Sequence, residues 1–344
     1  MLRPYLFFFL LFIGTGSVVV SIERLLTVDP FLNVSDPFLI NNDGLSGPIL
    51  GQIKKFHGLS ADPYDVGIFG SSTSMMVTAQ NLDVNECRVF NFSILGESLR
   101  SSVVFIEAMA NEGKLPPIVL IGVDNFEVQN YGNSRIISVH ERIREMFRDV
   151  LAAFQEPRIK YIDATRMILR HLITQRDVIE RKLNIDLVAA AVRSLFSTNR
   201  SHPLLTDVGS GFRADGTYDW KRAYPTVPHE IMRSRPRAIL PGYLRYDLKR
   251  VYEATRDKTD VYIFETPVEP ISQSYFMEHP GSVATRSRNE FLKACLEFGL
   301  RCFQAPERLS DDPLIWKDHV HAPPAQLGAY FKTFVPDMGK ACSN

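Results

Sequence analysis

The segment VGIFGSSTSMM, Val66–Met76, decides the class of fold that the surrounding chain is expected to form. An apolar run stops at Gly70, and the hydroxyl residues Ser71–Ser74 follow it directly. A short apolar run bounded by glycine is typical of a buried strand, and serine or threonine after it is typical of a helix start. The segment therefore predicts a strand that leads through a hydroxyl-rich turn into a helix.

Other apolar runs repeat this pattern, with helical periodicity between them. Helical spacing is clearest in ESLRSSVVFIEAMANEG and RNEFLKACLEFG, and in each the closing glycine is a suitable helix stop. Strands that alternate with helices imply a mostly parallel sheet covered on both faces, an α/β fold. The further predicted strands are Val89–Phe92, Ile118–Ile121, Val261–Phe264 and the LRCF segment at 300–303.

The stretch from about 131 to 258 departs from this alternation. It contains the amphipathic pattern ERIREMFRDVLAAF and, later, a polar loop with several glycines. We interpret it as a helical and loop insertion between two strands, within a domain that covers 61–344. Such an insertion is expected to cap the carboxyl edge of the sheet, where open α/β sheets bind ligands.

The N-terminus carries an uncharged segment, Tyr5–Ile22, flanked by Arg3 and by Glu23. A membrane-spanning helix needs about 20 apolar residues, so the segment suffices for an anchor over 1–25. The alternative is a cleaved signal peptide, although no good A-x-A cleavage site follows the apolar run. Arg3 then favours an extracytoplasmic position for the body of the protein, with 26–60 as a membrane-proximal lead-in.

Composition narrows the class of protein without selecting one. Of the 344 residues, 45% are apolar and 23% charged, as in a folded globular protein, and the formal net charge is zero. Without a basic face, nucleic-acid binding is not expected. The four cysteines match no zinc motif and fit an oxidising compartment. Cys295 and Cys302 are close enough in sequence to form a disulfide, or else are unpaired core residues.

The hydroxyl residues Ser71–Ser74 allow two interpretations. A phosphate-binding P-loop would need a lysine, and a Gly-x-Ser-x-Gly elbow would need a second glycine; neither is present. Helix capping and a serine nucleophile remain. A nucleophile needs a base with an orienting carboxylate, and Asp318 and His321 provide that pair on one short turn near the C-terminus. Glu265 and Thr266 follow the predicted strand Val261–Phe264. Either they lie at the same carboxyl edge of the sheet as Ser71–Ser74, or they only form a local turn.

Four sequence blocks, in order, resemble those of the SGNH (GDSL-like) hydrolase superfamily. IFGSSTS resembles the block with Gly-Asp-Ser, with Ser71 in place of the aspartate. FNFSILGESL resembles the second block, VLIGVDNFE resembles Gly-x-Asn-Asp, and the Asp318/His321 pair matches the last block. The resemblance covers about 65–130 and 260–335. It implies a flavodoxin-like three-layer α/β/α fold with a mostly parallel sheet.

The resemblance also implies a role for each matching residue. Ser72 would be the nucleophile, His321 the general base and Asp318 its orienter. The oxyanion hole would use the backbone N–H groups of Ser72 and Gly96, together with a side-chain amide after the third strand. The family's asparagine position is Asp124 here. We expect the next residue, Asn125, to supply the donor through a shifted turn; the alternatives are that Asp124 stays protonated or that the site is weak or degenerate.

Two insertion residues, His202 and Arg213, are candidates for substrate binding, although a solvated loop is the favoured interpretation of the segment that contains them. No cofactor and no metal are implied. The expected function is a membrane-anchored serine esterase or O-acyltransferase that acts on acyl groups, above all acetyl, of an extracytoplasmic polysaccharide. Its partners would be an acylated carbohydrate or acyl donor, the membrane, and proteins of polysaccharide assembly. The alternative is a catalytically weak or inactive accessory protein that binds glycan or partner proteins during polysaccharide export.

Overall fold

The structure is a computed structural model, and it describes residues 54, 58–59, 64–94, 98–124, 148, 215–217, 243–270, 283–306 and 321–334. The chain divides into two compact units, Met1–Leu45 with Ile137–Thr206, and Ser46–Ile136 with Asp207–Asn344. All described residues except Arg148 belong to the second unit. The fold below is that of the second unit.

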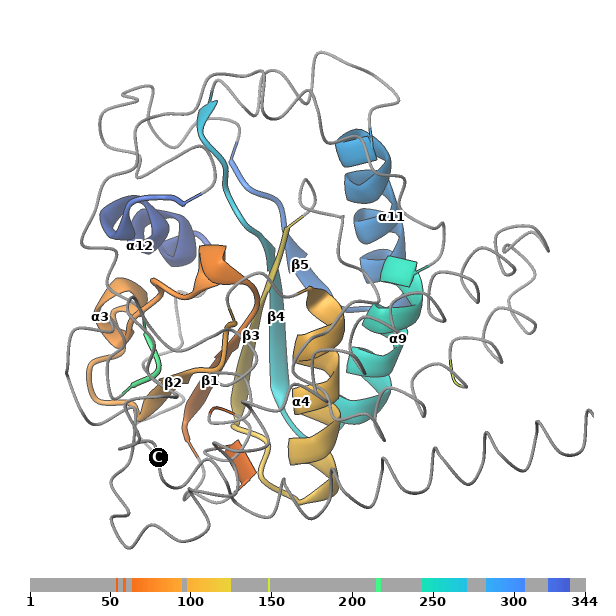
Figure 1. The fold of residues 1–344 in the computed structure, drawn as a ribbon, viewed down its shortest axis with the longest axis horizontal. Coiled ribbons are helices and arrows are strands. Elements are labelled where there is room, and N and C mark those ends of the chain that lie inside the picture. Colours follow the sequence, from red (N-terminus) through yellow and green to blue (C-terminus); the bar gives the residue numbers. More distant parts are fainter. Residues whose placement is uncertain are drawn as a thin grey trace, which may run out of the picture. The chain divides into compact units, whose positions relative to one another are not determined.

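A five-stranded, all-parallel sheet forms the centre of this unit (Figure 1). The strand order is β2-β1-β3-β4-β5, so β1 and β3 pair directly and β2 lies outside β1. The predicted α/β class and parallel sheet are thereby confirmed. The strands are β1 (Val66–Phe69), β2 (Val89–Asn91), β3 (Ile118–Val123), β4 (Asp260–Glu265) and β5 (Arg301–Phe303).

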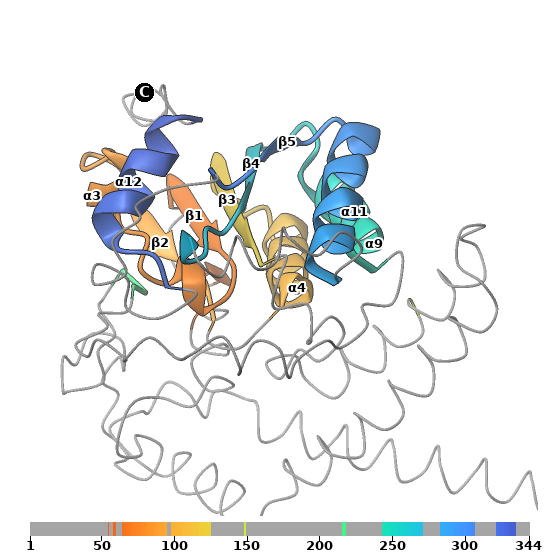
Figure 2. The ribbon, with the colours of Figure 1, turned by 90° about the horizontal axis from the view of Figure 1, so that it is seen from above.

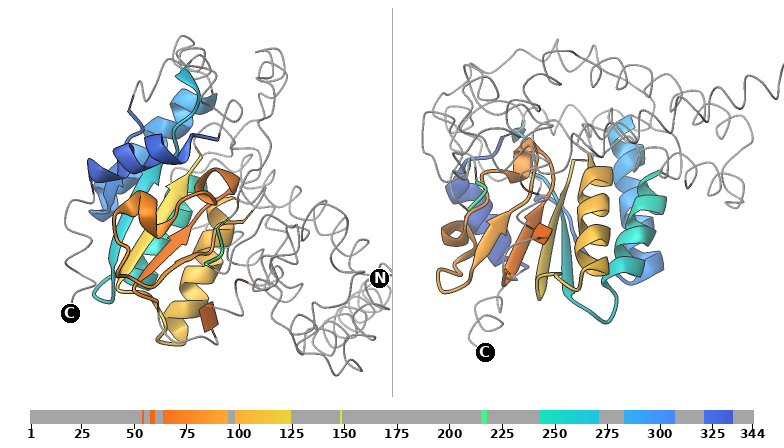
Figure 3. Two further views of the ribbon diagram at one scale, coloured as in Figure 1. Left: turned by 90° about the vertical axis from the view of Figure 1, so that its left-hand side faces the viewer. Right: turned by 60° about the horizontal axis from the view of Figure 1, so that its bottom comes forward.

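Helices lie on both faces of the sheet, as the turned views show (Figures 2 and 3). On one face α12 packs against α3, and on the other α9 packs against both α4 and α11. Helix α9 lies inside the range 131–258 that the sequence assigned to the insertion, yet it is part of this helical layer. The helices are α3 (Ala79–Leu82), α4 (Leu99–Asn111), α9 (Tyr243–Thr255), α11 (Val283–Phe298) and α12 (Pro324–Lys332), with a 3-10 helix η2 at Ser72–Ser74.

The helix stops follow from glycine geometry. Gly113 and Gly299 have φ angles of +67° and +65°, and no atom would lie within 4 Å of a Cβ added to either. This left-handed conformation is favourable for glycine and strained for other residues, so it ends a helix where the chain turns towards a strand. Both glycines stand at the stops that the sequence predicted.

Buried ion pairs join the helices of one layer. The Arg100 guanidinium of α4 donates to the Asp247 carboxylate of α9 at 2.6 Å, and both side chains are almost fully buried, at 1% and 0% exposure. A second pair, Arg250 with Glu107, runs between the same helices at 2.7 Å. Removing one partner of such a pair leaves a buried charge uncompensated, so these pairs fix how α4 and α9 are aligned.

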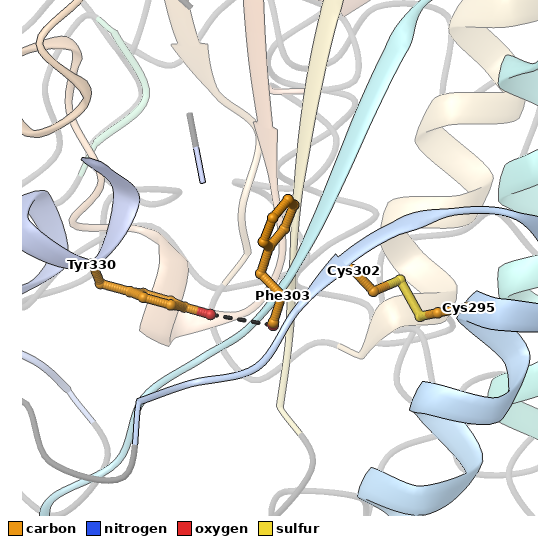
Figure 4. The surroundings of a disulfide bond; sticks show 4 residues. All are labelled: Cys295, Cys302, Phe303 and Tyr330. Atoms are coloured by element: carbon orange, nitrogen blue, oxygen red, sulfur yellow. Dashed lines mark hydrogen bonds between the residues drawn. A yellow bond between two sulfur atoms is a disulfide. The ribbon is translucent and has the colours of Figure 1, made fainter. Parts of the chain in front are cut away.

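A disulfide fixes the end of α11 to the edge strand β5 (Figure 4). Cys295 and Cys302 are bonded, with their Cα atoms 6.0 Å apart, which confirms the first of the two alternatives for this pair. Cys87 is also disulfide-bonded. Across the sheet, the Tyr330 hydroxyl of α12 donates to the Phe303 carbonyl at 3.2 Å. Strand β5 is therefore held by helices from both layers.

None of the helices within the described ranges combines the length and the apolar character needed to cross a membrane. The predicted anchor at Tyr5–Ile22 lies outside those ranges.

Candidate functional site

The candidate site is built on the turn that follows β1. Gly70 leaves the strand with φ of +150°, and a Cβ there would lie 2.6 Å from the Ser74 Oγ, so the position requires glycine. Ser71 then caps the 3-10 helix η2: its backbone is extended and its Oγ accepts a hydrogen bond from the Thr73 N–H at 3.3 Å. The predicted sequence of strand, hydroxyl-rich turn and helix start is confirmed.

The four hydroxyl groups of this turn have three different environments. Those of Ser71 and Thr73 donate to the carboxylate of Asp124, the latter at 2.7 Å. Ser74 is fully buried, and its Oγ has no hydrogen-bond partner within the described residues. For Ser72, 7% exposed, neither the hydroxyl nor the backbone N–H makes a hydrogen bond in the described part of the chain. Ser72 is thus the residue of the turn whose hydroxyl and N–H both remain available, while its carbonyl accepts from the Met75 N–H.

Asp124 follows β3 and collects hydroxyl donors from both neighbouring strands. Its Oδ2 accepts from Ser71, and its Oδ1 accepts from Thr73 and from Thr266, the residue after β4. We call Asp124, Ser71, Thr73 and Thr266 the Asp124 cluster. A carboxylate with three hydroxyl donors has its charge stabilised where it stands. The side chain is therefore engaged by the turn itself.

Ser74 fits between two glycines at the same strand ends. A Cβ on Gly122, in β3, would lie 2.0 Å from the Ser74 Oγ, closer than any real contact. On the other side, a Cβ on Gly70 would lie 2.6 Å from the same Oγ. The turn after β1 can therefore pack this closely on β3 because both positions lack a side chain.

The segment after β2 is held by two buried polar side chains. Asn91 is fully buried; its amide donates to the carbonyls of Ser74 at 2.8 Å and Val77 at 3.0 Å, and its Oδ1 accepts from the Ser93 N–H at 3.0 Å. Lys54 is also fully buried, and its Nζ donates to the Ser93 carbonyl at 2.5 Å. Buried polar groups are retained where their hydrogen bonds are made, and these bonds fix the turn after β2 next to the turn after β1.

Lys54 also reaches the insertion. Its Nζ donates to the Gly216 carbonyl at 2.8 Å, while the Asn91 N–H donates to the Asp215 carbonyl at 2.8 Å. Burial lowers the pKa of Lys54 well below 10.5, and the charge of Asp215 partly opposes this. Residues 215–217 therefore close the outer edge of β2, which is the edge strand on this side of the sheet.

His321 stands immediately before α12 and is 7% exposed. Its position follows from the packing of α12: Asn81 of α3 donates to the Pro324 carbonyl at 3.2 Å, and Ala322 belongs to the same core cluster as Met76 and Val77. The beginning of α12 thus lies beside the segment that follows Ser72. Since the Ser72 hydroxyl makes no hydrogen bond with a described residue, a Ser72–His321 hydrogen bond is not formed in this structure.

The other predicted site residues fall outside the described part of the chain. These are Asp318, the proposed orienter; Gly96 and Asn125, the proposed oxyanion donors; and His202 and Arg213, the substrate-binding candidates. Of the residues that are described, the structure joins Asp124 and Thr266 in one cluster with the turn that carries Ser72.

Two features of the site were missed by sequence reasoning. Lys54 lies in the predicted lead-in, where a lysine is ordinarily solvated; Ile53 and Phe56 beside it are apolar, but they do not indicate that the ammonium group itself is buried. The Asp124 cluster had a partial signal, because Asp124 and Thr266 each follow a predicted strand and the carboxyl ends of parallel strands lie at one edge. Within the described ranges, no group of three or more His, Cys, Asp or Glu side chains could hold a metal ion.

Comparison with family models gave no match, and no curated protein or solved structure was found to be similar.

Proposed function

We propose that this chain is a serine esterase or O-acyltransferase of the SGNH type, with Ser72 as its nucleophile. The strand order β2-β1-β3-β4-β5 supports this, because it is the order of the flavodoxin-like doubly wound sheet that the resemblance implies. In such sheets ligands bind outside the carboxyl ends of the strands near the point where the order reverses. Here that point is β1/β3, and Ser72 follows β1.

The observation that carries the proposal is the unequal engagement of the hydroxyl residues Ser71–Ser74. Ser71 and Thr73 are bound to Asp124 and Ser74 is buried between glycines, whereas the hydroxyl and N–H of Ser72 are unused by the described residues. A nucleophile must keep its oxygen available to substrate, and an oxyanion hole needs an N–H that no protein acceptor occupies. Ser72 meets both requirements within one residue.

In the proposed reaction the Ser72 Oγ attacks the carbonyl carbon of an ester, and its proton passes to His321, which Asp318 orients. The tetrahedral oxyanion is stabilised by the Ser72 N–H and by donors from Gly96 and Asn125. Collapse expels the alcohol, which takes the proton from His321 and leaves an acyl ester on Ser72. Water or a sugar hydroxyl then attacks this ester, giving its proton to His321 and afterwards to Ser72, with release of the acid or of a new ester.

The remaining parts of the proposal concern substrate and location. We propose acetyl as the acyl group, a polysaccharide outside the cytoplasm as the carbohydrate, and Tyr5–Ile22 as the membrane anchor. His202 and Arg213 are the proposed contacts to substrate. The support is the resemblance, together with the oxidising compartment that the disulfide-bonded cysteines Cys87, Cys295 and Cys302 favour.

One observation favours a second function. The Ser72 hydroxyl makes no hydrogen bond with a described residue, so the relay to His321 is not assembled in this structure. An accessory protein that binds glycan at the same edge would need no relay. In free enzymes, however, catalytic hydrogen bonds are often long and form fully only with substrate, so the esterase or transferase remains our proposal.

The test is labelling of the full-length chain with a fluorophosphonate, which reacts with an activated serine. The wild type should be labelled at Ser72, and Ser72→Ala and His321→Ala should not be labelled. Ser74→Ala is the matched control, because it removes a hydroxyl from the same turn and should leave labelling unchanged. Folded wild-type protein that is not labelled would favour the accessory function, and labelling of Ser72→Ala would show that the nucleophile is another residue.

A further inference from the structure

We propose that Asp124 is a positioning residue for Ser72, and that it acts as one unit with Ser71. This inference rests on the proposed function, since it assigns Asp124 a role only if Ser72 reacts. It also explains why a carboxylate occupies a position where the family pattern has an amide.

The geometry of the Asp124 cluster supports this role. One carboxylate accepts hydrogen bonds from the residues on both sides of Ser72: Oδ2 from the Ser71 hydroxyl and Oδ1 from the Thr73 hydroxyl at 2.7 Å. The chain between two anchored neighbours has little freedom, so the Ser72 backbone is fixed relative to β3. Thr266 fixes the same carboxylate to the end of β4. Asp124 therefore holds the turn that carries Ser72 in a fixed position relative to the ends of β3 and β4.

The two departures from the resembled pattern occur at positions that touch each other. The pattern has an acid before the serine and an amide after the third strand; this chain has Ser71 and Asp124 at those places. The Ser71 hydroxyl donates to the Asp124 carboxylate, so this contact still contains one acid, which stands at position 124 instead of position 71. Two acids here would repel each other, and a contact without any acid would lose its charge-assisted hydrogen bonds. The two departures therefore compensate each other.

The orientation of Asp124 also removes an apparent obstacle to catalysis. A carboxylate aimed at the oxyanion would oppose its formation, because both groups are negative. The Asp124 carboxylate is instead engaged by Ser71, Thr73 and Thr266. Its charge is thus committed to three donors in the protein.

The experiment compares the fluorophosphonate labelling rates of four full-length proteins: wild type, Ser71→Asp, Asp124→Asn and the double variant. Ser71→Asp places two acids in contact, and Asp124→Asn replaces an acceptor atom by an amide nitrogen. Because each single change weakens or opposes the charge-assisted hydrogen bond between Ser71 and Asp124, each should slow labelling by about tenfold or more. The double variant restores one acid to the pair and should label at least about fivefold faster than the slower single variant.

Rescue of this kind separates positioning from general stability. With a small acetyl ester, the single variants should lower kcat while leaving KM within about twofold, since the carboxylate acts on the nucleophile and not on substrate binding. If the labelling losses of the single variants multiply in the double variant, the two residues act independently and the proposal is wrong. If Ser72→Ala is labelled as fast as wild type, the proposed function fails instead, whatever the Asp124 variants do.

If Ser71→Asp or Asp124→Asn reduces the yield of folded protein, a second pair of variants still tests the proposal. Thr73→Val and Thr266→Val each remove one hydroxyl donor to the Asp124 Oδ1, but only Thr73 borders Ser72. Thr73→Val should slow labelling by about tenfold and Thr266→Val by less than about threefold, at similar unfolding temperatures. An equal or greater loss of labelling rate in Thr266→Val would contradict the proposal that Asp124 acts through the turn that carries Ser72.

Discussion

Gly122→Ala should be more damaging than the same change at Gly67, the other glycine within the described strands, where an added Cβ would lie 2.9 Å from its nearest neighbours. At Gly122 the added Cβ would lie 2.0 Å from the Ser74 Oγ and 3.1 Å from both Phe264 and Thr266 side-chain atoms. Ser74 is fully buried, so its side chain has little room to move away from the added methyl group. Overpacking of this kind costs about 1–3 kcal/mol, and about 2 kcal/mol corresponds to a fall of about 4–8 °C in unfolding temperature.

The reasoning is tested by removing the atom that causes the contact. Ser74→Ala alone deletes a buried hydroxyl that has no partner among the described residues, so it should leave stability unchanged or raise it by about 1 kcal/mol. In Gly122→Ala/Ser74→Ala the contacts that remain are those at 3.1 Å, which need a shift of only a few tenths of an ångström. The double variant should therefore regain at least half of the loss.

The assay is thermal unfolding of the three variants and the wild type, followed by circular dichroism at one protein concentration. Two results would refute the account: Gly122→Ala that unfolds within about 1 °C of wild type, or a double variant no more stable than Gly122→Ala. The first would mean that β1 and β3 are not packed this closely. The second would mean that the cost arises elsewhere than at Ser74.

Two further predictions concern stability. The double variant Cys295→Ser/Cys302→Ser removes the disulfide, whose cysteines have a sequence separation of 7. Closure of a loop of that size predicts a loss of about 2.5 kcal/mol in the free energy of unfolding, measured as a lower unfolding temperature. An unchanged unfolding temperature would contradict this prediction. Burial lowers the pKa of Lys54 in the folded chain, so below 10.5 the unfolded chain binds more protons and stability should rise with pH towards 10.5. Lys54→Met should flatten that rise between pH 7 and pH 10, and a difference from wild type that does not change with pH would count against it.

The sheet could be predicted because its strands carry their own signals. Each apolar run ends at glycine, proline or a polar residue, and β1 occupies the predicted Val66–Phe69. Strand β4 extends one residue beyond the predicted Val261–Phe264 at each end. The added residues, Asp260 and Glu265, pair with β3, but their polar side chains gave no indication of a strand. Register between strands, unlike strand location, depends on partners that are distant in sequence.

The candidate site was predictable only in part. Ser71–Ser74 are chemically similar, and nothing local distinguishes Ser72 from its neighbours. The distinction arises from Asp124 and Gly122. Asp124 stands more than 50 positions along the chain from Ser71, which its side chain contacts. The resemblance nominated Ser72, and its role as the nucleophile stays a prediction. The burial of Lys54 had no sequence signal, because its acceptors are backbone carbonyls, which every residue possesses.

The bond from Lys54 to Gly216 joins positions 162 residues apart, and this imposes an order in time. A ribosome adds about 5–20 residues per second, so roughly 8–30 s pass between synthesis of the lysine and synthesis of its acceptor. From the synthesis of residue 123 to the end of that interval, the residues of β1, β2 and β3 are all present, but the lysine lacks one carbonyl acceptor and the outer edge of β2 is uncovered. An uncovered strand edge can pair with other chains. The nascent protein is therefore most exposed to misassembly before residues 215–217 are synthesised.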